Sequence, residues 1–165
     1  MLCLSNWRKL SVNILIGFWI KRDTDKCLTM ADFVSPEKRS RIMRGSKSKN
    51  TKPELVVRRA LQNVRRGYRL HRRDIPGRPD IAFIGLQKAI FVHGCFWHQH
   101  EKSGCPVSRK PSSNSGFWEA KFLNNKERDR RNRNALIQQG WGVLEIWECE
   151  VHSDDLEDRL SDFLR

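Results

Sequence analysis

Long hydrophobic runs are missing from this chain of 165 residues, of which only 38% are apolar. The longest apolar stretch, residues 10–20, contains two polar residues and is too short to cross a bilayer. Basic residues precede it, as in a signal peptide, but residues 21–23 are charged and offer no small-residue cleavage site. The sequence therefore excludes a membrane protein. We expect residues 1–29 to be a non-functional upstream extension, with the working protein starting at Met30.

Cysteines are too few and too scattered for a disulfide framework. The chain has five, an odd number, and they stand at positions 3, 27, 95, 105 and 149. Histidines lie close to two of them. This pattern favours metal ligation in a reducing compartment over disulfide pairing.

Acidic residues are scarce in one part of the chain and abundant in another. Residues 36–75 hold 14 lysines and arginines against 3 acidic residues, whereas residues 144–165 hold 2 against 8. The formal net charge is +13. A merely well-solvated surface would mix both signs evenly. The separation instead indicates a polyanion as partner, and it favours nucleic acid.

The length allows one domain with a real core, and the patterns along it are of the α/β class. Thr51, Pro53 and Glu54 form a capping box, which predicts a helix ending before Gly67. The other predicted elements are strands at 68–71, 81–84, 89–92 and 141–147, a loop over 103–116, a helix over 117–139, and a last helix capped by Ser153. We expect a small mixed sheet flanked by helices in residues 51–165, preceded by a basic arm at 30–50 that a partner orders.

The stretch from Phe91 to Cys105 contains three of the five histidines and two of the five cysteines. The predicted hairpin brings its first residues beside Asp80, which follows Pro79 at the mouth of a strand. An isolated Asp there would be an ordinary turn residue. Because a backbone carbonyl and an imidazole such as His98 are expected beside Asp80, this group of residues indicates a Mg²⁺ site for phosphodiester hydrolysis.

Three cysteines and a histidine have the composition of a closed zinc site. The group is Cys95, His100, Cys105 and Cys149. Its spacing is looser than that of paired cysteine motifs, and it leaves open whether His98 or His100 is the ligand. Cys149 alone would more often be a small buried apolar residue.

Aromatic residues accompany these polar groups. Phe96 and Trp97 lie between potential ligands, in what we expect to be a tight loop, and this position suits stacking on bases. An ordinary core position explains Trp118, on the helix of residues 117–139, better than it explains Phe96 and Trp97. Asp129 lies on the same helical face as Trp118. A carboxylate buried there needs a partner, such as His93 or His98. Glu54 is explained locally by the capping box.

These residues resemble the very-short-patch mismatch repair endonucleases of bacteria, the Vsr family. The matching stretches are PGRPD at 76–80, FVHGCFWHQH at 91–100, FW at 117–118, Asn125, ERDRR at 127–131 and WEC at 147–149. They are collinear over residues 31–151, and HGCFWH is highly specific.

The resemblance implies a restriction-endonuclease-like fold and an enzyme that nicks the thymine strand 5′ to a T:G mispair arising from deaminated 5-methylcytosine. Asp80 and the main-chain carbonyl of Val92 would hold Mg²⁺, and His98 would be the general base oriented by Asp129, with His93 and Glu54 in support. Zinc would sit on Cys95, His100, Cys105 and Cys149. Phe96, Trp97 and Trp118 would wedge into the duplex, while Asn125 and the arm residues Arg39, Arg41 and Arg44 would contact DNA.

The resemblance also implies a cytoplasmic bacterial monomer that acts on double-stranded DNA and works with mismatch-repair proteins. Two departures stand out. Val92 replaces a threonine common in the family, and the stretch from His100 to Cys105 is longer than in its best-known member. Two rivals remain open, namely a homing- or restriction-type nuclease on the same fold and a non-catalytic zinc module that binds DNA.

Overall fold

The computed structural model describes residues 35, 37, 40–41, 45, 47–112 and 114–165. In this part the elements are α2 (Lys52–Val64), β1 (Arg69–Leu70), β2 (Ile81–Phe83), η1 (Ile84–Leu86), β3 (Lys88–His93), α3 (Cys95–His98), α4 (Ser115–Gln138), β4 (Gly142–Trp147), η2 (Glu148–Glu150) and α5 (Leu156–Leu164). No helix of the described residues is long and apolar enough to cross a membrane. Residues 1–29, Arg39 and Arg44 lie outside the described residues, whereas Arg41 is described and exposed.

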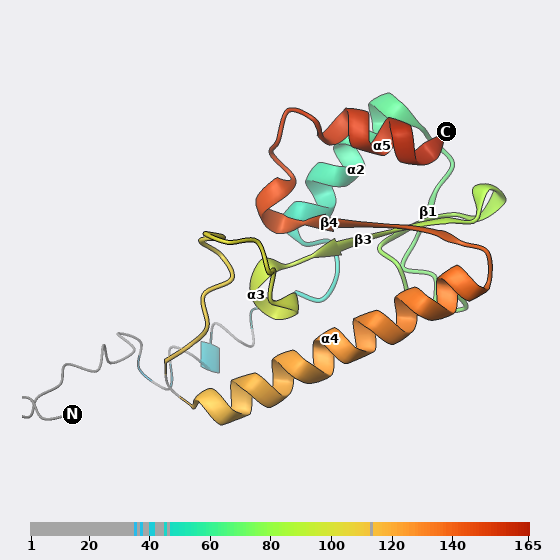
Figure 1. Ribbon diagram of the computed structural model, residues 1–165. Helices are drawn as coiled ribbons and strands as arrows, with labels where there is room; N and C mark the ends of the chain where they lie inside the picture. Colours follow the sequence, from blue (N-terminus) through green and yellow to red (C-terminus); the bar gives the residue numbers. More distant parts are fainter. Residues whose placement is uncertain (1–34, 36, 38–39, 42–44, 46, 113) are drawn as a thin grey trace, which may run out of the picture.

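The four strands form one mixed sheet in the order β1-β2-β3-β4. β2 and β3 make the predicted antiparallel hairpin, in which Ile81 pairs with Ile90. β3 and β4 are parallel, so the chain between them must cross from one end of the sheet to the other. The crossover contains α4, which runs along the sheet (Figure 1). The prediction of a small mixed sheet flanked by helices is confirmed.

Helices cover the sheet on both faces (Figure 1). On one face, α2 and α5 pack beside each other and place Val57, Leu61 and Leu160 against Ile81, Ile90 and Ile146 of the sheet. On the other face, Leu136 of α4 packs with Ile75, Ala82 and Ala89. Leu61, Leu136 and Leu160 are fully buried. Truncating any one of these leucines to alanine should cost about 2–5 kcal/mol of stability, because it removes buried apolar contacts and leaves a cavity.

The capping box at the start of α2 is confirmed. The backbone N–H of Glu54 donates to the side chain of Thr51, and the Glu54 carboxylate accepts from the backbone N–H of Thr51. Pro53 lies in the first turn, where a missing N–H costs nothing. This sequence signal thus fixes both the start of α2 and the direction of the Glu54 side chain.

Two local predictions were wrong. Residues 95–98 form the one-turn helix α3 instead of a loop, and Gln99 ends it in the left-handed region with a φ of 49°. Ser153 does not cap the last helix, because its hydroxyl donates to the Glu150 carbonyl at 2.7 Å. Asp155 occupies the N-cap position instead, without a capping hydrogen bond from its side chain. The inward face of α5 is as expected, with Leu156, Leu160 and Leu164 buried.

Candidate active site

Asp80 lies directly before β2 and is joined to the neighbouring strand. Its Oδ2 atom accepts a hydrogen bond of 2.8 Å from the backbone N–H of Val92. The pKa of Asp80 is raised to about 6, mainly by burial and also by the nearby charge of Glu54, against the opposing effect of the Val92 N–H. A carboxylate that is costly to ionise in this place gains from a cation. That is the condition expected of a metal ligand.

The Val92 carbonyl faces the same edge of β3 as its N–H. In an antiparallel pair, a residue directs both backbone groups toward the same neighbour, and for Val92 that neighbour is the strand entrance at Asp80. A carboxylate and a backbone carbonyl are the hard oxygen donors that Mg²⁺ prefers. The Asp80 carboxylate and the Val92 carbonyl are therefore donors of the kind that could hold a divalent metal ion.

The turn that carries Asp80 packs closely against α4. Gly77 has a φ of 74°, and a Cβ atom built on it would lie 2.8 Å from the Cβ of Asn132. Arg78 also has a positive φ, of 52°, which is uncommon for a residue with a side chain. Pro79 is fully buried. Glycine at 77 thus allows the turn to approach α4, and the turn is held there by packing.

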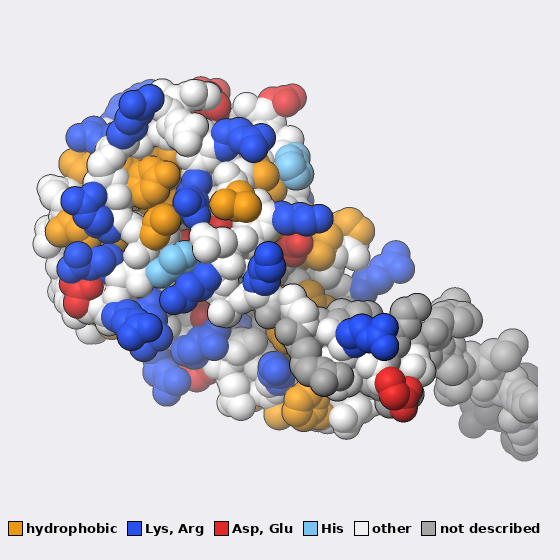
Figure 2. All heavy atoms as spheres, turned by 180° about the vertical axis from the view of Figure 1, so that it is seen from behind, with side chains coloured by type: hydrophobic (Ala, Val, Ile, Leu, Met, Phe, Trp, Pro, Cys, Tyr) orange, Lys and Arg blue, Asp and Glu red, His pale blue; other side chains and the backbone are white. Residues whose placement is uncertain are grey.

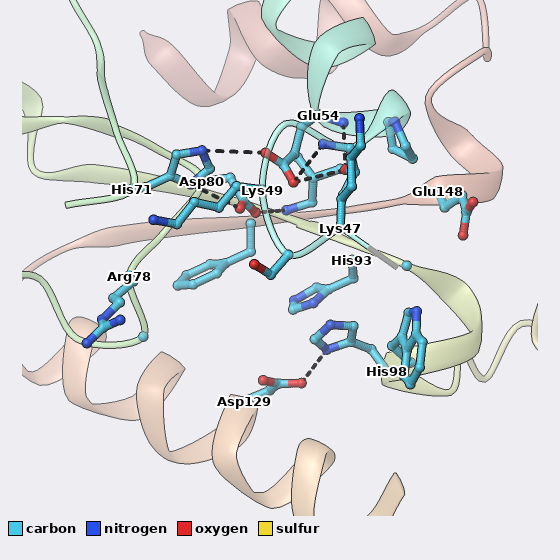
Figure 3. A pocket seen from close by; sticks show the side chains of 18 of the residues that line it. Lys47, Lys49, Glu54, His71, Arg78, Asp80, His93, His98, Asp129 and Glu148 are labelled. Atoms are coloured by element: carbon cyan, nitrogen blue, oxygen red, sulfur yellow. Dashed lines mark hydrogen bonds and ion pairs between the residues drawn. The ribbon is translucent and has the colours of Figure 1, made fainter. Parts of the chain in front are cut away.

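Glu54 belongs both to the capping box at the start of α2 and to the lining of the candidate site. Its side chain is buried, and it accepts hydrogen bonds from Asn50 and Thr51 at the start of α2. The same carboxylate faces the cavity that contains Asp80. Figure 3 shows Glu54 and Asp80 on the same side of the site, close to His71.

His71 is a site residue that sequence reasoning did not identify. It follows β1, and its backbone N–H donates to the Asp80 carbonyl at 3.3 Å. The imidazole lies 3.6 Å from a Glu54 oxygen and 3.8 Å from an Asp80 oxygen. The register supplies the missing signal, because Leu70 pairs with Ile81 and His71 must then lie opposite Asp80.

On the other side of the cavity, His98 pairs with Asp129. The Nδ1 atom of His98 lies 2.5 Å from Oδ2 of Asp129, whose other oxygen accepts from Arg128 at 3.0 Å. Burial acts to raise the pKa of Asp129, but the bonds from His98 and Arg128 keep it below its usual value. Of the two partners considered for Asp129, His98 is the one bonded to it. A carboxylate on Nδ1 leaves Nε2 free to accept a proton.

His93 lies between these two groups (Figure 3). Its ring is 4.1 Å from that of His98 and 5.2 Å from that of Trp147, measured between centroids. Burial, together with the charge of His98, lowers the pKa of His93 to about 4. His93 is therefore neutral at physiological pH.

These residues line one open cavity of about 1150 Å³, which is above the usual range for small-molecule sites. Basic side chains line it, namely Lys47, Lys49, Lys52, Arg73, Arg78, Arg128 and Arg133. Lysine and arginine also spread over the face of the molecule seen in Figure 2. The size, openness and charge suit a segment of a polyanion.

The four residues expected to bind zinc lie close together in space, and one of them, Cys95, begins α3. One ligand atom from each of Cys95, His100, Cys105 and Cys149 lies within 4.8 Å of the others. The Nδ1 atom of His100 is 3.3 Å from the Cys149 sulfur and 3.7 Å from the Cys95 sulfur. Burial raises the pKa of the Cys95 thiol to about 12, so its thiolate needs a cation. His100, and not His98, belongs to this group, which fits tetrahedral zinc.

The aromatic residues of α3 and α4 form a cluster. The ring of Phe96 lies 5.1 Å from Trp97, 5.3 Å from Trp118 and 5.4 Å from Phe122. Trp118 is only 7% exposed, as its core-like position in the sequence suggests. Trp97 is half-buried and lines the cavity, where Lys121 lies over its ring at 5.4 Å.

Two polar side chains hold α3 in place. The amide of Asn125 donates to the Trp97 carbonyl at 2.9 Å, so this residue supports the aromatic cluster from α4. Glu148 accepts from the backbone N–H of Cys95 at 3.3 Å and thus satisfies a donor at the start of α3. Glu148 was not identified from the sequence. Its position next to Cys149 is the signal that would have found it.

Carboxylates and imidazoles that converge in a basic cavity define a hydrolytic enzyme acting on a polyanion. Residues 31–103 match the family model described as DNA mismatch endonuclease Vsr. The chain is 36% identical over 122 residues to the DNA mismatch endonuclease Vsr of Escherichia coli, which covers 74% of this chain and 76% of that protein. The chain belongs to the Vsr family, and it is a DNA mismatch endonuclease.

Other relatives are named as nicking enzymes. The chain is 43% identical over 136 residues to the Type II nicking enzyme V.XorIIP of Xanthomonas oryzae pv. oryzae, a match over 82% of this chain and 98% of that protein. It is 36% identical over 137 residues to the Type II nicking enzyme V.NmeAIP of Neisseria meningitidis. That match covers 82% of this chain and 96% of that protein. The family resemblance predicted from the motifs is confirmed.

Proposed function

We propose that this endonuclease nicks the thymine-containing strand of a duplex 5′ to a T:G mispair and thereby starts very-short-patch repair. The observation that carries the proposal is the arrangement of two groups across one basic cavity. Asp80 and Val92 lie on one side, the His98–Asp129 pair lies on the other, and Trp97 stands in the wall. The restriction-endonuclease-like fold implied by the resemblance accords with the mixed sheet and its helices.

The reaction proposed is hydrolysis of one phosphodiester bond. Nε2 of His98 takes a proton from water, the water oxygen forms a bond to phosphorus, and the bond to O3′ breaks, with the O3′ oxygen taking a proton from a solvent water. The products are a 3′-hydroxyl and a 5′-phosphate. Asp129 holds the imidazole of His98 in the tautomer that accepts the proton, and it stabilises the imidazolium that results.

In this proposal Asp80 and the Val92 carbonyl would hold Mg²⁺, with Glu54 in support from α2. A bound ion would supply positive charge where negative charge develops on the phosphate oxygens. His93, which is neutral and buried, shapes the cavity wall between Asp80 and His98.

Mismatch selection is assigned to the aromatic cluster. Stacking a side chain into an opened step offsets an unstacking cost that is smallest at a mispair. Trp97 is the first candidate because it lines the cavity, and Phe96 and Trp118 lie behind it. Asn125 then acts by holding the Trp97 backbone in position as well as through any contact with DNA.

The remaining roles follow from charge and from the family. The basic arm of residues 30–50, including Arg39, Arg41 and Arg44, contacts phosphates, and residues 51–165 form the endonuclease domain. Zinc on Cys95, His100, Cys105 and Cys149 stabilises the segment that carries α3. The protein acts as a cytoplasmic monomer alongside mismatch-repair proteins, and residues 1–29 contribute nothing to nicking.

Asp80→Ala and His98→Ala test the proposal. Both variants should abolish nicking of a T:G duplex and retain duplex binding, because binding comes mainly from basic residues. Exposed His152→Ala is the matched control and should nick normally. If either active-site variant still nicks, the chemistry lies elsewhere. If one loses DNA binding together with its fold in a thermal melt, that residue has a structural role.

A further inference from the structure

The third group of potential ligands in the described residues combines Glu54, His71 and Asp80, and its ligand atoms lie within 4.8 Å of one another. It is distinct from the zinc group and from the His93–His98–Asp129 group. We propose that His71 is a nitrogen ligand in this site, so that the cation position beside Asp80 accepts transition ions such as Mn²⁺ through a mixed nitrogen and oxygen donor set. The inference rests on the proposed function only in placing a cation at Asp80.

The first argument is the state of the His71 ring. Its Nε2 atom is buried and has no hydrogen-bond partner among the described residues. The nearest carboxylate oxygen, on Glu54, is 3.6 Å away and beyond ordinary hydrogen-bond length. A buried polar atom without a partner is costly, and native proteins keep such atoms where a ligand satisfies them.

The second argument is distance. Nε2 of His71 lies 3.6 Å from a Glu54 oxygen and Nδ1 lies 3.8 Å from an Asp80 oxygen, both too far for hydrogen bonds. One ligand atom from each of Glu54, His71 and Asp80 lies within 4.8 Å of the others, which suits donors arranged around a common ion. Metal–nitrogen and metal–oxygen bonds of about 2.0–2.2 Å place neighbouring donors roughly 3–4 Å apart. The Asp80 oxygen facing His71 is Oδ1, whereas Oδ2 is the one bonded to the Val92 N–H. Asp80 therefore has an oxygen free on this side.

The third argument is the backbone of His71. This residue has a φ of 47°, in the left-handed region that is uncommon for residues with a side chain, although histidine adopts it more often than most. The turn at this point directs the ring back toward Glu54 and Asp80 (Figure 3). Unfavourable backbone of this kind persists where the surrounding structure holds it, and it is concentrated at ligand sites.

The chemistry of the donors sets the choice of ion. Mg²⁺ takes oxygen donors and retains much of its water. First-row transition ions bind nitrogen-containing sites according to donor type and geometry, and imidazole is a common ligand for them. Removing His71 should therefore weaken binding of a transition ion more than binding of Mg²⁺.

The test is Mn²⁺ binding to the full chain without DNA. Electron spin echo spectra of bound Mn²⁺ should show modulation from a directly bound ¹⁴N in the unaltered protein. This modulation should be lost in His71→Gln. The Kd for Mn²⁺ should rise at least about tenfold in that variant, while the Kd for Mg²⁺, measured by competition, should change far less. His152→Gln, on the surface, should match the unaltered protein in every reading.

Several results would overturn the inference. Absence of ¹⁴N modulation in the unaltered protein overturns it whether or not any variant folds. Modulation that persists in folded His71→Gln assigns the nitrogen to another histidine, and equal weakening of both ions makes His71 a structural residue. A protein that binds Mn²⁺ through His71 but never nicks DNA would instead contradict the proposed function alone.

Discussion

Nδ1 of His98 and Oδ2 of Asp129 lie 2.5 Å apart although 31 positions separate the two residues in the chain. His98 ends the one-turn helix α3, and Asp129 lies in the middle of α4. The contact therefore depends on how α3 docks on α4. Asn125, one turn before Asp129, bonds the Trp97 backbone and fixes that docking. The base proposed for catalysis is thus held by the same interface that carries the aromatic cluster.

Asp129→Asn should lower the rate of T:G nicking by about 10²–10⁴-fold, because an amide does not stabilise the imidazolium and permits the wrong tautomer of His98. DNA affinity should change little. Single-turnover rates measured with bound substrate give the comparison, and Asp162→Asn, at an exposed position of α5, is the matched control. An Asp129→Asn enzyme that nicks at the normal rate would show that Asp129 serves only the helix interface.

Asp80→Asn should stabilise the protein in the absence of added Mg²⁺, increasingly as pH rises. The pKa of Asp80 is raised from 3.8 to about 6 in the folded protein. Protonated Asp80 therefore costs no stability below about pH 3.8, whereas ionised Asp80 lowers the free energy of unfolding as the pH rises to about 6. The gain from asparagine should therefore grow between about pH 4 and 6 and then level off, at an upper limit of about 3 kcal/mol. Urea unfolding of both proteins across this range measures it. A gain in unfolding free energy that does not change with pH would mean that Asp80 has the same pKa in the folded and unfolded protein.

One zinc ion per chain should be found by metal analysis of active protein. Cys95→Ser and Cys149→Ser should lose the ion and unfold, because a closed zinc site contributes folding free energy directly. Cys27→Ser, at a cysteine outside the four, should keep both metal and fold. Active protein without zinc would refute the assignment of Cys95, His100, Cys105 and Cys149.

Trp97→Ala should weaken binding to a T:G duplex far more than binding to matched DNA, since stacking on an opened step is worth about 1–3 kcal/mol per base. Arg41→Ala should weaken all duplexes alike and reduce the slope of log affinity against log salt by about one. Affinity measured against salt for both variants on both duplexes separates these effects. Equal losses on T:G and matched DNA for Trp97→Ala would make Trp97 a general contact.

Local signals in the sequence predicted much of this structure. The capping box fixed the start of α2, and the spacing of two apolar runs fixed the β2–β3 hairpin that joins Asp80 to Val92. Features that depend on register or docking were not accessible. His71 reaches Asp80 only through the β1–β2 register. The residue patterns alone left His93 and His98 open as partners of Asp129, the family resemblance favoured His98, and the docking of α3 on α4 makes that contact.

The two wrong predictions have different origins. A four-residue helix such as α3 is too short to show a period, so residues 95–98 looked like a loop. Ser153 is a good N-cap by type, but its hydroxyl bonds backward to Glu150 and the helix starts three residues later. Competing hydrogen bonds to nearby backbone are common for serine.

Single-turnover nicking of three duplexes that differ only at one position, T:G, T:A or C:G, with each strand labelled separately, tests the central claim most directly. The account predicts Mg²⁺-dependent cleavage of the thymine strand alone, 5′ to the thymine of T:G, with a 5′-phosphate on the product. The T:A and C:G duplexes should remain intact under the same conditions. Equal cleavage of T:A, or cleavage of both strands, would contradict the account and favour a homing- or restriction-type nuclease.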